Sequence, residues 1–140
     1  MAHICAKSWI PVKNNSLSGT LSDKIGDLNQ LEYFWGSYNQ LSGSIPTTVG
    51  RCRHLMVLNL QNSRLSGPTP DKFGDMRSIW HLSLENNRLS GTIPPSLLDM
   101  RSISHLLLEN NRLSGTTPPS LFWAGLCALY LDGNQAHTYR

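Results

Sequence analysis

One nine-residue segment occurs twice in this chain, letter for letter, at an interval of 24 residues: LENNRLSGT occupies residues 84–92 and again 108–116. Its Leu-Ser-Gly core keeps this interval along most of the chain, at residues 17–19, 41–43, 65–67, 89–91 and 113–115. A period of this length is typical of repeat proteins, in which each unit buries its apolar face against its neighbours. The repeat therefore predicts an elongated array and not one central core.

Each unit carries two apolar residues at fixed positions before the leucine of Leu-Ser-Gly. They precede that leucine by seven and five residues, as Ile10 and Val12, Leu58 and Leu60, Leu82 and Leu84, and Leu106 and Leu108. Alternating apolar residues predict a short strand with one buried face, and one strand per unit predicts parallel strands about 4.8 Å apart. In the second unit Gly36 replaces a leucine. The aromatic residues at 33–35 are expected to fill the space that is left.

A polar column follows these predicted strands: Asn15, Asn39, Ser63, Asn87 and Asn111. An amide at the end of a strand can bond backbone groups that the turning chain leaves unpaired. The column therefore predicts a hydrogen-bonding ladder whose weakest rung is Ser63. Thr69 and Thr117 stand where other units have an inward isoleucine or leucine, and each buried hydroxyl then needs a partner.

Composition excludes several classes of protein. The formal net charge is +3 and 15% of the residues are charged, with no block of basic residues, so we expect no nucleic-acid partner. No run of about 18 apolar residues could span a bilayer. The first residues also lack the charged start and apolar stretch of a secretory signal, so the sequence leaves the compartment open.

The three cysteines, Cys5, Cys52 and Cys127, lie far apart and do not have the spacing of a metal site. Their odd number argues against a disulfide framework. Cys52 falls in an apolar column, so we expect it to be a small buried hydrophobic residue and not a reactive thiol.

The aligned units resemble the plant-type leucine-rich repeat family, whose unit reads LxxLxxLxLxxNxLSGxIPxxLGxL. The resemblance runs from about Ile10 to Asn134 and is closest over residues 76–116, where MRSIWHLSLENNRLSGTIP is followed by almost the same segment again. It implies an α/β fold, a leucine-rich repeat solenoid. In such a solenoid a parallel β-sheet lines the concave side, short second strands follow it, and 3₁₀ turns lie on the convex side.

The resemblance also implies a domain organisation. Residues 1–140 form a single array of about six units, with degenerate units at 1–17 and 126–140 and without clear caps. Extracellular members of the family usually have an N-terminal cap with paired cysteines around a tryptophan, and Cys5 and Trp9 resemble a remnant of it. Because arrays normally need polar capping units, the uncapped terminal repeats could associate end to end.

By resemblance, relatives are ectodomains of receptor-like kinases and receptor-like proteins, and polygalacturonase inhibitors, which suggests an extracellular or cell-surface location. The expected function is non-catalytic recognition of a protein or peptide, or of a cell-wall enzyme or glycan, through the concave face. Outward residues of the first sheet are not needed in the core, so a partner would be recognised there. The candidate residues are Tyr33, Trp35, Tyr38, Trp80, His81, Glu85, His105, Glu109, Tyr130 and Asp132.

Two groups within this set have alternative interpretations. Tyr33, Trp35, Tyr38 and Trp80 are expected to form an aromatic grouping toward the N-terminal half of the face, since exposed aromatic residues are typical binding anchors. The alternative is that Trp35 covers the gap at Gly36.

The second group is an acidic column, Glu85, Glu109 and Asp132, with steps of about 5 Å. The column would attract a basic patch on a partner. The alternative is a solvated edge, neutralised by Arg88 and Arg112.

Catalysis has little support in the sequence. His81 and Glu85 are separated by about 13 Å on an extended strand, whereas a hydrogen-bonded acid–base pair needs about 3 Å. His81 and His105 lie on adjacent strands and could hold a metal, but further ligands are lacking. No nucleophile, phosphate or metal motif occurs. We therefore expect no enzyme, no cofactor and no metal.

Two other functions compete with recognition through the concave face. Regular hydroxyl groups on the second strands would suit an ice-binding surface, as in some plant antifreeze proteins that resemble this family. The two predicted ranks run along Ser18, Ser42, Ser66, Ser90 and Ser114, and along Thr20, Ser44, Thr92 and Thr116 with Pro68 interrupting. The other alternative is an inert structural segment of a larger receptor ectodomain.

Overall fold

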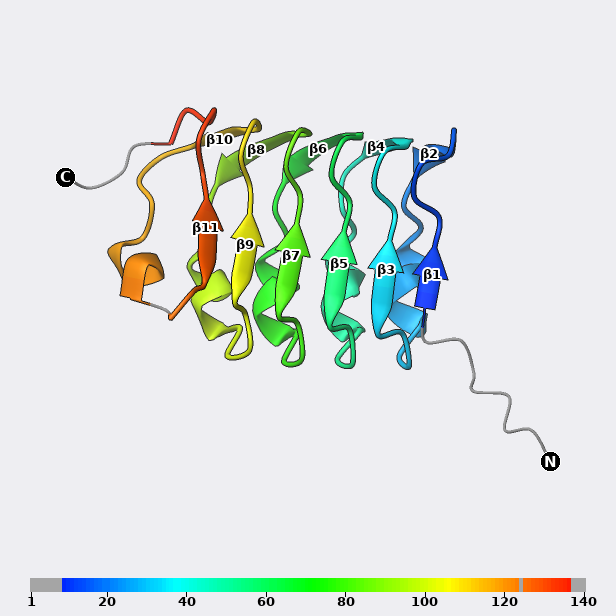
Figure 1. The fold of residues 1–140 in the computed structure, drawn as a ribbon, viewed down its shortest axis with the longest axis horizontal. Helices are drawn as coiled ribbons and strands as arrows, with labels where there is room; N and C mark the ends of the chain where they lie inside the picture. Colours follow the sequence, from blue (N-terminus) through cyan, green and yellow to red (C-terminus); the bar gives the residue numbers. More distant parts are fainter. Residues whose placement is uncertain (1–8, 124, 137–140) are drawn as a thin grey trace.

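The computed structural model describes residues 9–123 and 125–136, which form a solenoid of turns that lie side by side (Figure 1). One side is a six-stranded parallel sheet whose strands follow chain order. Its strands are β1 (Trp9–Pro11), β3 (Tyr33–Trp35), β5 (Val57–Asn59), β7 (His81–Ser83), β9 (His105–Leu107) and β11 (Ala128–Tyr130). The predicted stack of parallel strands, one per repeat, is confirmed.

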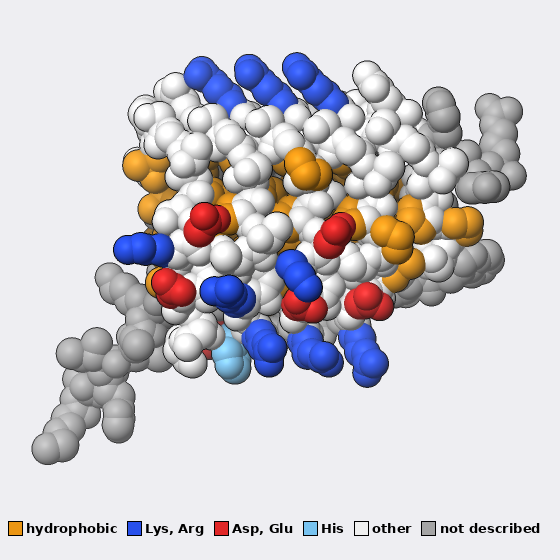
Figure 2. Space-filling view, turned by 180° about the vertical axis from the view of Figure 1, so that it is seen from behind, with side chains coloured by type: hydrophobic (Ala, Val, Ile, Leu, Met, Phe, Trp, Pro, Cys, Tyr) orange, Lys and Arg blue, Asp and Glu red, His pale blue; other side chains and the backbone are white. Residues whose placement is uncertain are grey.

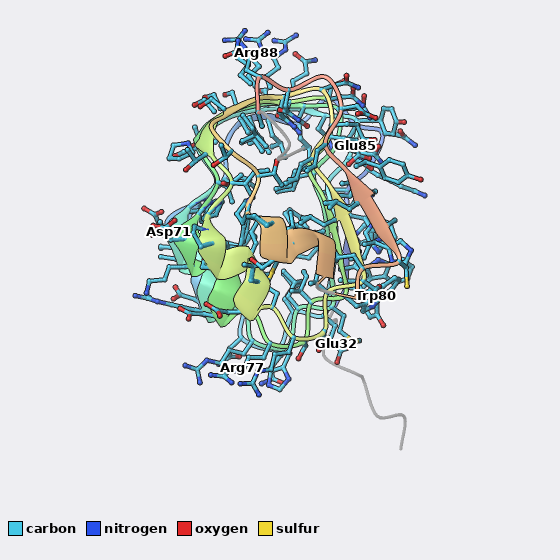
Figure 3. All side chains as sticks on the ribbon, turned by 90° about the vertical axis from the view of Figure 1, so that its left-hand side faces the viewer. Glu32, Asp71, Arg77, Trp80, Glu85 and Arg88 are labelled. Atoms are coloured by element: carbon cyan, nitrogen blue, oxygen red, sulfur yellow. The ribbon has the colours of Figure 1, made fainter. Side chains whose placement is uncertain are left out.

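A second parallel sheet and a row of 3₁₀ helices complete each turn. The five strands of the second sheet are β2 (Ser18–Thr20), β4 (Gln40–Gly43), β6 (Arg64–Pro68), β8 (Arg88–Thr92) and β10 (Arg112–Ser114). The helices are η1 (Asp23–Asp27), η2 (Thr47–Arg51), η3 (Asp71–Asp75), η4 (Pro95–Asp99) and η5 (Pro119–Trp123). Figure 3 looks along the solenoid and shows these layers around one core. The predicted solenoid architecture is confirmed.

The leucine columns form this core, as the period of two predicts. Leu58, Leu82 and Leu106 pair in register on adjacent strands and are at most 1% exposed. Burying a leucine side chain contributes about 1.5–3 kcal/mol relative to leaving it in water. Because every turn adds the same leucines, this contribution repeats along the array.

The asparagine ladder is also present. Asn87 donates from Nδ2 to the carbonyl oxygens of Leu60 at 2.9 Å and Leu84 at 3.1 Å, and its Oδ1 accepts from the Leu65 amide at 3.0 Å. The same pattern recurs at Asn39, Asn111 and Asn134. Ser63 is too short for it, and its buried hydroxyl has no partner. Each asparagine therefore ties its own turn to the preceding one, and one rung is missing at Ser63.

Glycines let the 3₁₀ helices stack closely. A Cβ atom on Gly26 would lie 2.6 Å from the carbonyl oxygen of Thr48, and one on Gly74 would lie 2.6 Å from that of Ser96. Gly50 has the same close contact with the carbonyl oxygen of Lys72. Real Cβ atoms do not approach oxygen so closely, so these positions require glycine.

The gap at Gly36 is filled from inside the core. A Cβ atom there would lie 3.0 Å from Leu60 Cδ2 and 3.5 Å from Phe34 Cζ. Phe34 is the buried residue of β3, whereas Trp35 is only half-buried. The expectation that a neighbouring aromatic residue fills the gap is confirmed for Phe34. Covering the gap does not require Trp35.

Three further expectations concern buried polar groups and cysteines. Thr69 Oγ1 donates to the Thr92 carbonyl oxygen at 3.5 Å, whereas the buried Thr117 hydroxyl has no partner. Cys52 is fully buried, as predicted; its thiol donates to the Ile25 carbonyl oxygen, and burial raises the pKa of Cys52. Cys5 lies outside the described residues.

Candidate binding surface on the six-stranded sheet

The outward side chains of the six-stranded sheet form two continuous columns, in the predicted register. One runs from Trp9 and Tyr33 through Val57, His81 and His105 to Ala128. The other runs from Pro11 and Trp35 through Asn59, Ser83 and Leu107 to Tyr130. Equivalent residues are direct neighbours because the register keeps the repeat interval. The two columns define one surface, called here the six-stranded face, in which Val57, Asn59 and Ser83 are buried between half-buried neighbours.

The N-terminal part of this face is aromatic. Tyr33 and Trp35 are half-buried, and Tyr38, in the turn after β3, is 53% exposed. Tyr38 has a φ of 55°, in the left-handed region, where the equivalent turns have asparagine: Asn14, Asn62, Asn86 and Asn110. A bulky residue is strained in this region, whereas asparagine tolerates it. Tyr38 is therefore kept at a position that its own backbone conformation disfavours.

Trp80 does not belong to this aromatic part. Its ring lies edge-on to His81 at 5.5 Å and to His105 at 5.8 Å, measured between ring centroids. No ring contact joins Trp80 to Tyr33, Trp35 or Tyr38 among the described residues, because β5 with Val57 lies between β3 and β7. The expected grouping of four aromatic residues is therefore corrected: Trp80 lies with the two histidines, apart from Tyr33, Trp35 and Tyr38.

The two histidines lie side by side, as predicted, with ring centroids 5.5 Å apart. Ser104 holds His105 in place, because its Oγ lies 2.8 Å from His105 Nδ1 and donates to the Trp80 carbonyl oxygen at 3.1 Å. A hydroxyl has one hydrogen, which goes to the Trp80 carbonyl oxygen, so His105 Nδ1–H donates to Ser104 Oγ. Burial, and then His105, lower the pKa of His81. His81 is therefore biased toward the neutral form.

The acidic column begins in a buried position. Glu85 is only 7% exposed, and Ser83 Oγ donates to its Oε2 at 2.7 Å. Burial raises the pKa of Glu85, and the neighbouring Glu109 raises it further, against the opposing effect of the Ser83 hydrogen bond. Glu109 is half-buried, with one carboxylate oxygen buried and unpartnered, and Asp132 is exposed. The column thus presents two incompletely solvated carboxyl groups on adjacent turns.

Among the described residues, Arg88 and Arg112 form no ion pair with this column, so the alternative of neutralisation by these arginines has no support from direct pairing. The ion pair between Lys72 and Asp75, at 3.8 Å, is the only one among the described residues. Figure 3 shows Glu85 on the six-stranded face and Arg88 at the edge above it, pointing away. Asn86 and Asn87 separate Glu85 from Arg88, and the chain turns between them because Asn86 has a left-handed φ of 56°. Glu109 and Asp132 are therefore open to a partner, whereas Glu85 is largely buried.

The Ser and Thr ranks of the second sheet do not line up from strand to strand. Thr20 pairs with Ser42, and Ser114 pairs with Thr92, so the register there is offset by 22 residues and not by the repeat interval of 24. Ser42 and Ser114 also donate to the carbonyl oxygens of Gly19 and Gly91 at 3.3 and 3.4 Å. The straight ranks expected for an ice-binding surface are replaced by a staggered arrangement.

Sequence reasoning missed some residues of this surface. Ser104 orients His105, and Ser83 supports Glu85, but isolated serines carry no signal in the sequence. Both would be found only once the strand register is known. In the described part of the chain, no group of three or more His, Cys, Asp or Glu side chains is placed to hold a metal ion. No described helix is long and apolar enough to cross a membrane.

Comparison with known proteins places this chain in a family. The profile described as leucine rich repeat matches residues 53–113. The ectodomain of the receptor kinase SOBIR1 from Arabidopsis thaliana is 31% identical with a TM-score of 0.87, over 92% of this chain and 72% of that one. The plant peptide hormone receptor RGFR1, in complex with RGF2, is 33% identical with a TM-score of 0.89, over 91% of this chain and 20% of that one.

A third similar structure is PEPR1–AtPEP1, which is 29% identical with a TM-score of 0.87, over 94% of this chain and 21% of that one. No curated protein sequence matches the chain. The chain belongs to the plant-type leucine-rich repeat family, whose solved relatives include ectodomains of plant receptor kinases. It spans about a fifth of the length of the RGFR1 and PEPR1 chains.

Proposed function

We propose that this chain is a non-catalytic recognition module that binds a peptide or a protein segment across the six-stranded face. The observation that carries the proposal is the outward surface of the sheet, which is aromatic at β3, where Tyr38 is exposed, and acidic beyond β9, where Glu109 is half-buried and Asp132 exposed. Two similar structures, RGFR1 with RGF2 and PEPR1–AtPEP1, are complexes with a second component. Their likeness supports recognition as the use of this fold.

The charges of the surface favour a basic ligand. Glu85 and Glu109 lie on adjacent turns without a cationic partner. A Lys or Arg side chain placed between them would form charge-assisted hydrogen bonds with partly desolvated carboxylates, where such bonds are strongest. The aromatic side chains of β3 would meet an apolar side chain of the same ligand. The ligand class is therefore a basic segment with an apolar residue, carried by a peptide or by a protein such as a cell-wall enzyme.

The experiment that tests this proposal is selection of a random peptide library on the immobilised chain. Selected peptides should share a Lys or Arg and an apolar residue, and Trp35→Ala and Glu109→Lys should each weaken their binding about tenfold or more. Asp99→Lys is the matched control, because it changes the same charge on the opposite side, in η4. A library without enriched peptides would support the inert-segment alternative. Peptides unaffected by Trp35→Ala and Glu109→Lys would contradict the six-stranded face as the site.

A further inference from the structure

A second charged surface lies on the edge above the six-stranded face, away from the acidic column. Arg64, Arg88 and Arg112 are the first residues of β6, β8 and β10, and all three are exposed. Figure 2 shows a row of Lys and Arg side chains along this edge, and Figure 3 places Arg88 there. These three arginines are called here the arginine ridge.

The arginine ridge and the sheet below it carry no negative charge. The segments that build this layer contain no Asp or Glu: residues 14–20, 38–44, 62–68, 86–92 and 110–116. None of the three arginines forms an ion pair with a described residue. Three like charges on successive turns repel one another, and no ion pair with a described residue offsets this repulsion. The layer is therefore suited to an anion that extends over several turns.

The opposite edge of the solenoid differs, although it also carries three arginines at the same interval. There Arg77 and Arg101 share a hollow with Asp75 and Asp99. Arg53 lines another hollow of about 290 Å³ that also contains Asp75. Figure 2 shows acidic and basic side chains mixed along this lower edge. Carboxylates thus line the same hollows as the arginines of this edge, whereas the layer of the arginine ridge contains none.

The arginine ridge has neutral hydrogen-bonding groups beside it. In the register of the second sheet, Ser42 lies next to Arg64, Ser66 next to Arg88, and Ser90 next to Arg112. Because of the two-residue offset, successive arginine Cα atoms are about 8 Å apart, from the spacings between strands and along them. An anion that fits must therefore present charges at intervals, separated by groups that can bond hydroxyls.

We propose that the arginine ridge and the second sheet bind a linear carboxylated glycan, a polyuronate. Each guanidinium takes one carboxylate through two parallel N–H···O bonds, and the serines bond the sugar hydroxyls between them. Successive sugars of an extended polyuronate alternate in orientation along the chain. Carboxylates on one side of the glycan therefore recur at every second sugar. This spacing suits arginines that are about 8 Å apart. The strained, exposed Tyr38 lies at the end of this layer, in the second unit, where a sugar ring could stack on it.

Other polyanions fit this surface less well. Single-stranded nucleic acids are held by a basic groove together with aromatic side chains on which successive bases stack. The layer offers one aromatic residue, Tyr38, over all five of its segments. An acid-free, hydroxyl-rich surface with spaced arginines favours a glycan.

The test measures binding of oligogalacturonate to the full chain by calorimetry at several salt concentrations. Arg64→Gln/Arg88→Gln/Arg112→Gln should reduce the affinity about tenfold or more and flatten its salt dependence. The matched control is Arg53→Gln/Arg77→Gln/Arg101→Gln, which removes the same charge from the opposite edge and should leave the affinity within about twofold. All six side chains are exposed, and unchanged thermal unfolding checks that both variants fold.

Three further ligands decide the chemistry. Fully methyl-esterified oligogalacturonate should not bind, because the carboxylates are blocked. Equal losses in the two triple variants, or equal binding of the esterified glycan, would overturn the proposal. Tighter binding of heparin or of single-stranded DNA would overturn it in favour of a sulfated glycan or a nucleic acid. The result is separate from recognition on the six-stranded face, since Trp35→Ala and Glu109→Lys leave the arginine ridge unchanged.

Discussion

At the scale of single residues, the asparagine that follows each strand of the six-stranded sheet connects one turn of the chain to the next. Its amide hydrogens reach carbonyl oxygens of its own turn and of the preceding one, and its oxygen receives an amide of the preceding turn. Ser63 breaks this ladder because a hydroxyl is too short to span the same groups. The ladder and its weak rung could be predicted from the sequence, since both depend on residue type at a fixed position.

The ladder predicts different effects of two alanine substitutions on the free energy of unfolding. Asn87→Ala should lower the free energy of unfolding by about 2–4 kcal/mol, because it leaves buried backbone groups unpaired. Ser63→Ala should be neutral or slightly stabilising, since it removes a buried hydroxyl that has no partner. Ser63→Asn should restore the rung and raise the free energy of unfolding by about 1 kcal/mol. Urea denaturation measures all three, and equal losses for Asn87→Ala and Ser63→Ala would contradict the ladder.

Glu85 gives the stability of the protein a defined pH dependence. Burial raises its pKa in the folded protein above the ordinary value of an unfolded glutamate. Between these two values the folded protein binds more protons, so the free energy of unfolding rises as the pH falls through the folded pKa, and levels off below the unfolded pKa. Glu85→Gln should stabilise the protein at neutral pH and remove this contribution.

The measurement is the difference in free energy of unfolding between the unmodified chain and Glu85→Gln across this pH range. His81 has the opposite effect, because its lowered pKa destabilises the folded protein as the pH falls below the ordinary histidine value. It contributes equally to both proteins and cancels in the difference. A constant difference across the range would mean that the folded and unfolded pKa of Glu85 are equal.

At the scale of elements, both sheets were predictable, but only the register of the first one was. The leucine pairs fix which residues of each strand point inward, so Leu82 and Leu84 locate β7 and its outward neighbours. The register of the second sheet depends on how far each turn shifts against the last, and a repeated sequence carries no information on that shift. The contact of Trp80 with His105 could not be predicted for the same reason, since Trp80 precedes β7 and His105 belongs to the neighbouring strand β9. These contacts between turns shape the candidate surface.

The 3₁₀ helices show the same dependence on contacts between turns. Gly26, Gly50 and Gly74 occupy one position of η1, η2 and η3, and each lies against the following turn. In η4 this position is Leu98, which packs partly buried against the core. Figure 1 shows η5 set apart from the stacked helices. The Leu98 side chain explains why η5 does not stack on η4, because it occupies the space that a glycine would leave for the backbone of the next turn.

Gly74→Ala tests this explanation. The new Cβ would lie 2.6 Å from the Ser96 carbonyl oxygen, so η3 and η4 must move apart. The free energy of unfolding should fall by about 1–3 kcal/mol, as for other overpacked sites. Asp71→Ala, at an exposed position of the same helix, should change it by less than about 0.5 kcal/mol. Chemical denaturation of the two variants compares them, and equal effects would show that glycine is not needed for the stacking.

At the scale of the whole molecule, the solenoid separates stability from recognition. Residues that repeat without change, such as the inward leucines and Asn87, hold the turns together. Residues that vary between units, such as Trp35 and Glu109, lie on the surface proposed to bind a ligand. The arginine ridge belongs to neither group, since Arg64, Arg88 and Arg112 repeat in three units and remain exposed. Their repetition matches the repetitive ligand proposed for this edge.

The array should also lose its structure unevenly, because each turn is stabilised mainly by the turns on either side. The central strands β5 and β7 contain leucines that are at most 1% exposed, whereas Ile10 of β1 and Leu129 of β11 are only partly buried. Amide hydrogen exchange should therefore be slowest in β5 and β7 and become faster toward β1 and β11. Mass spectrometry of exchanged peptic peptides measures this gradient. Uniform protection across all six strands would mean that the array unfolds as one cooperative unit, with coupling between turns stronger than the stability of any single turn.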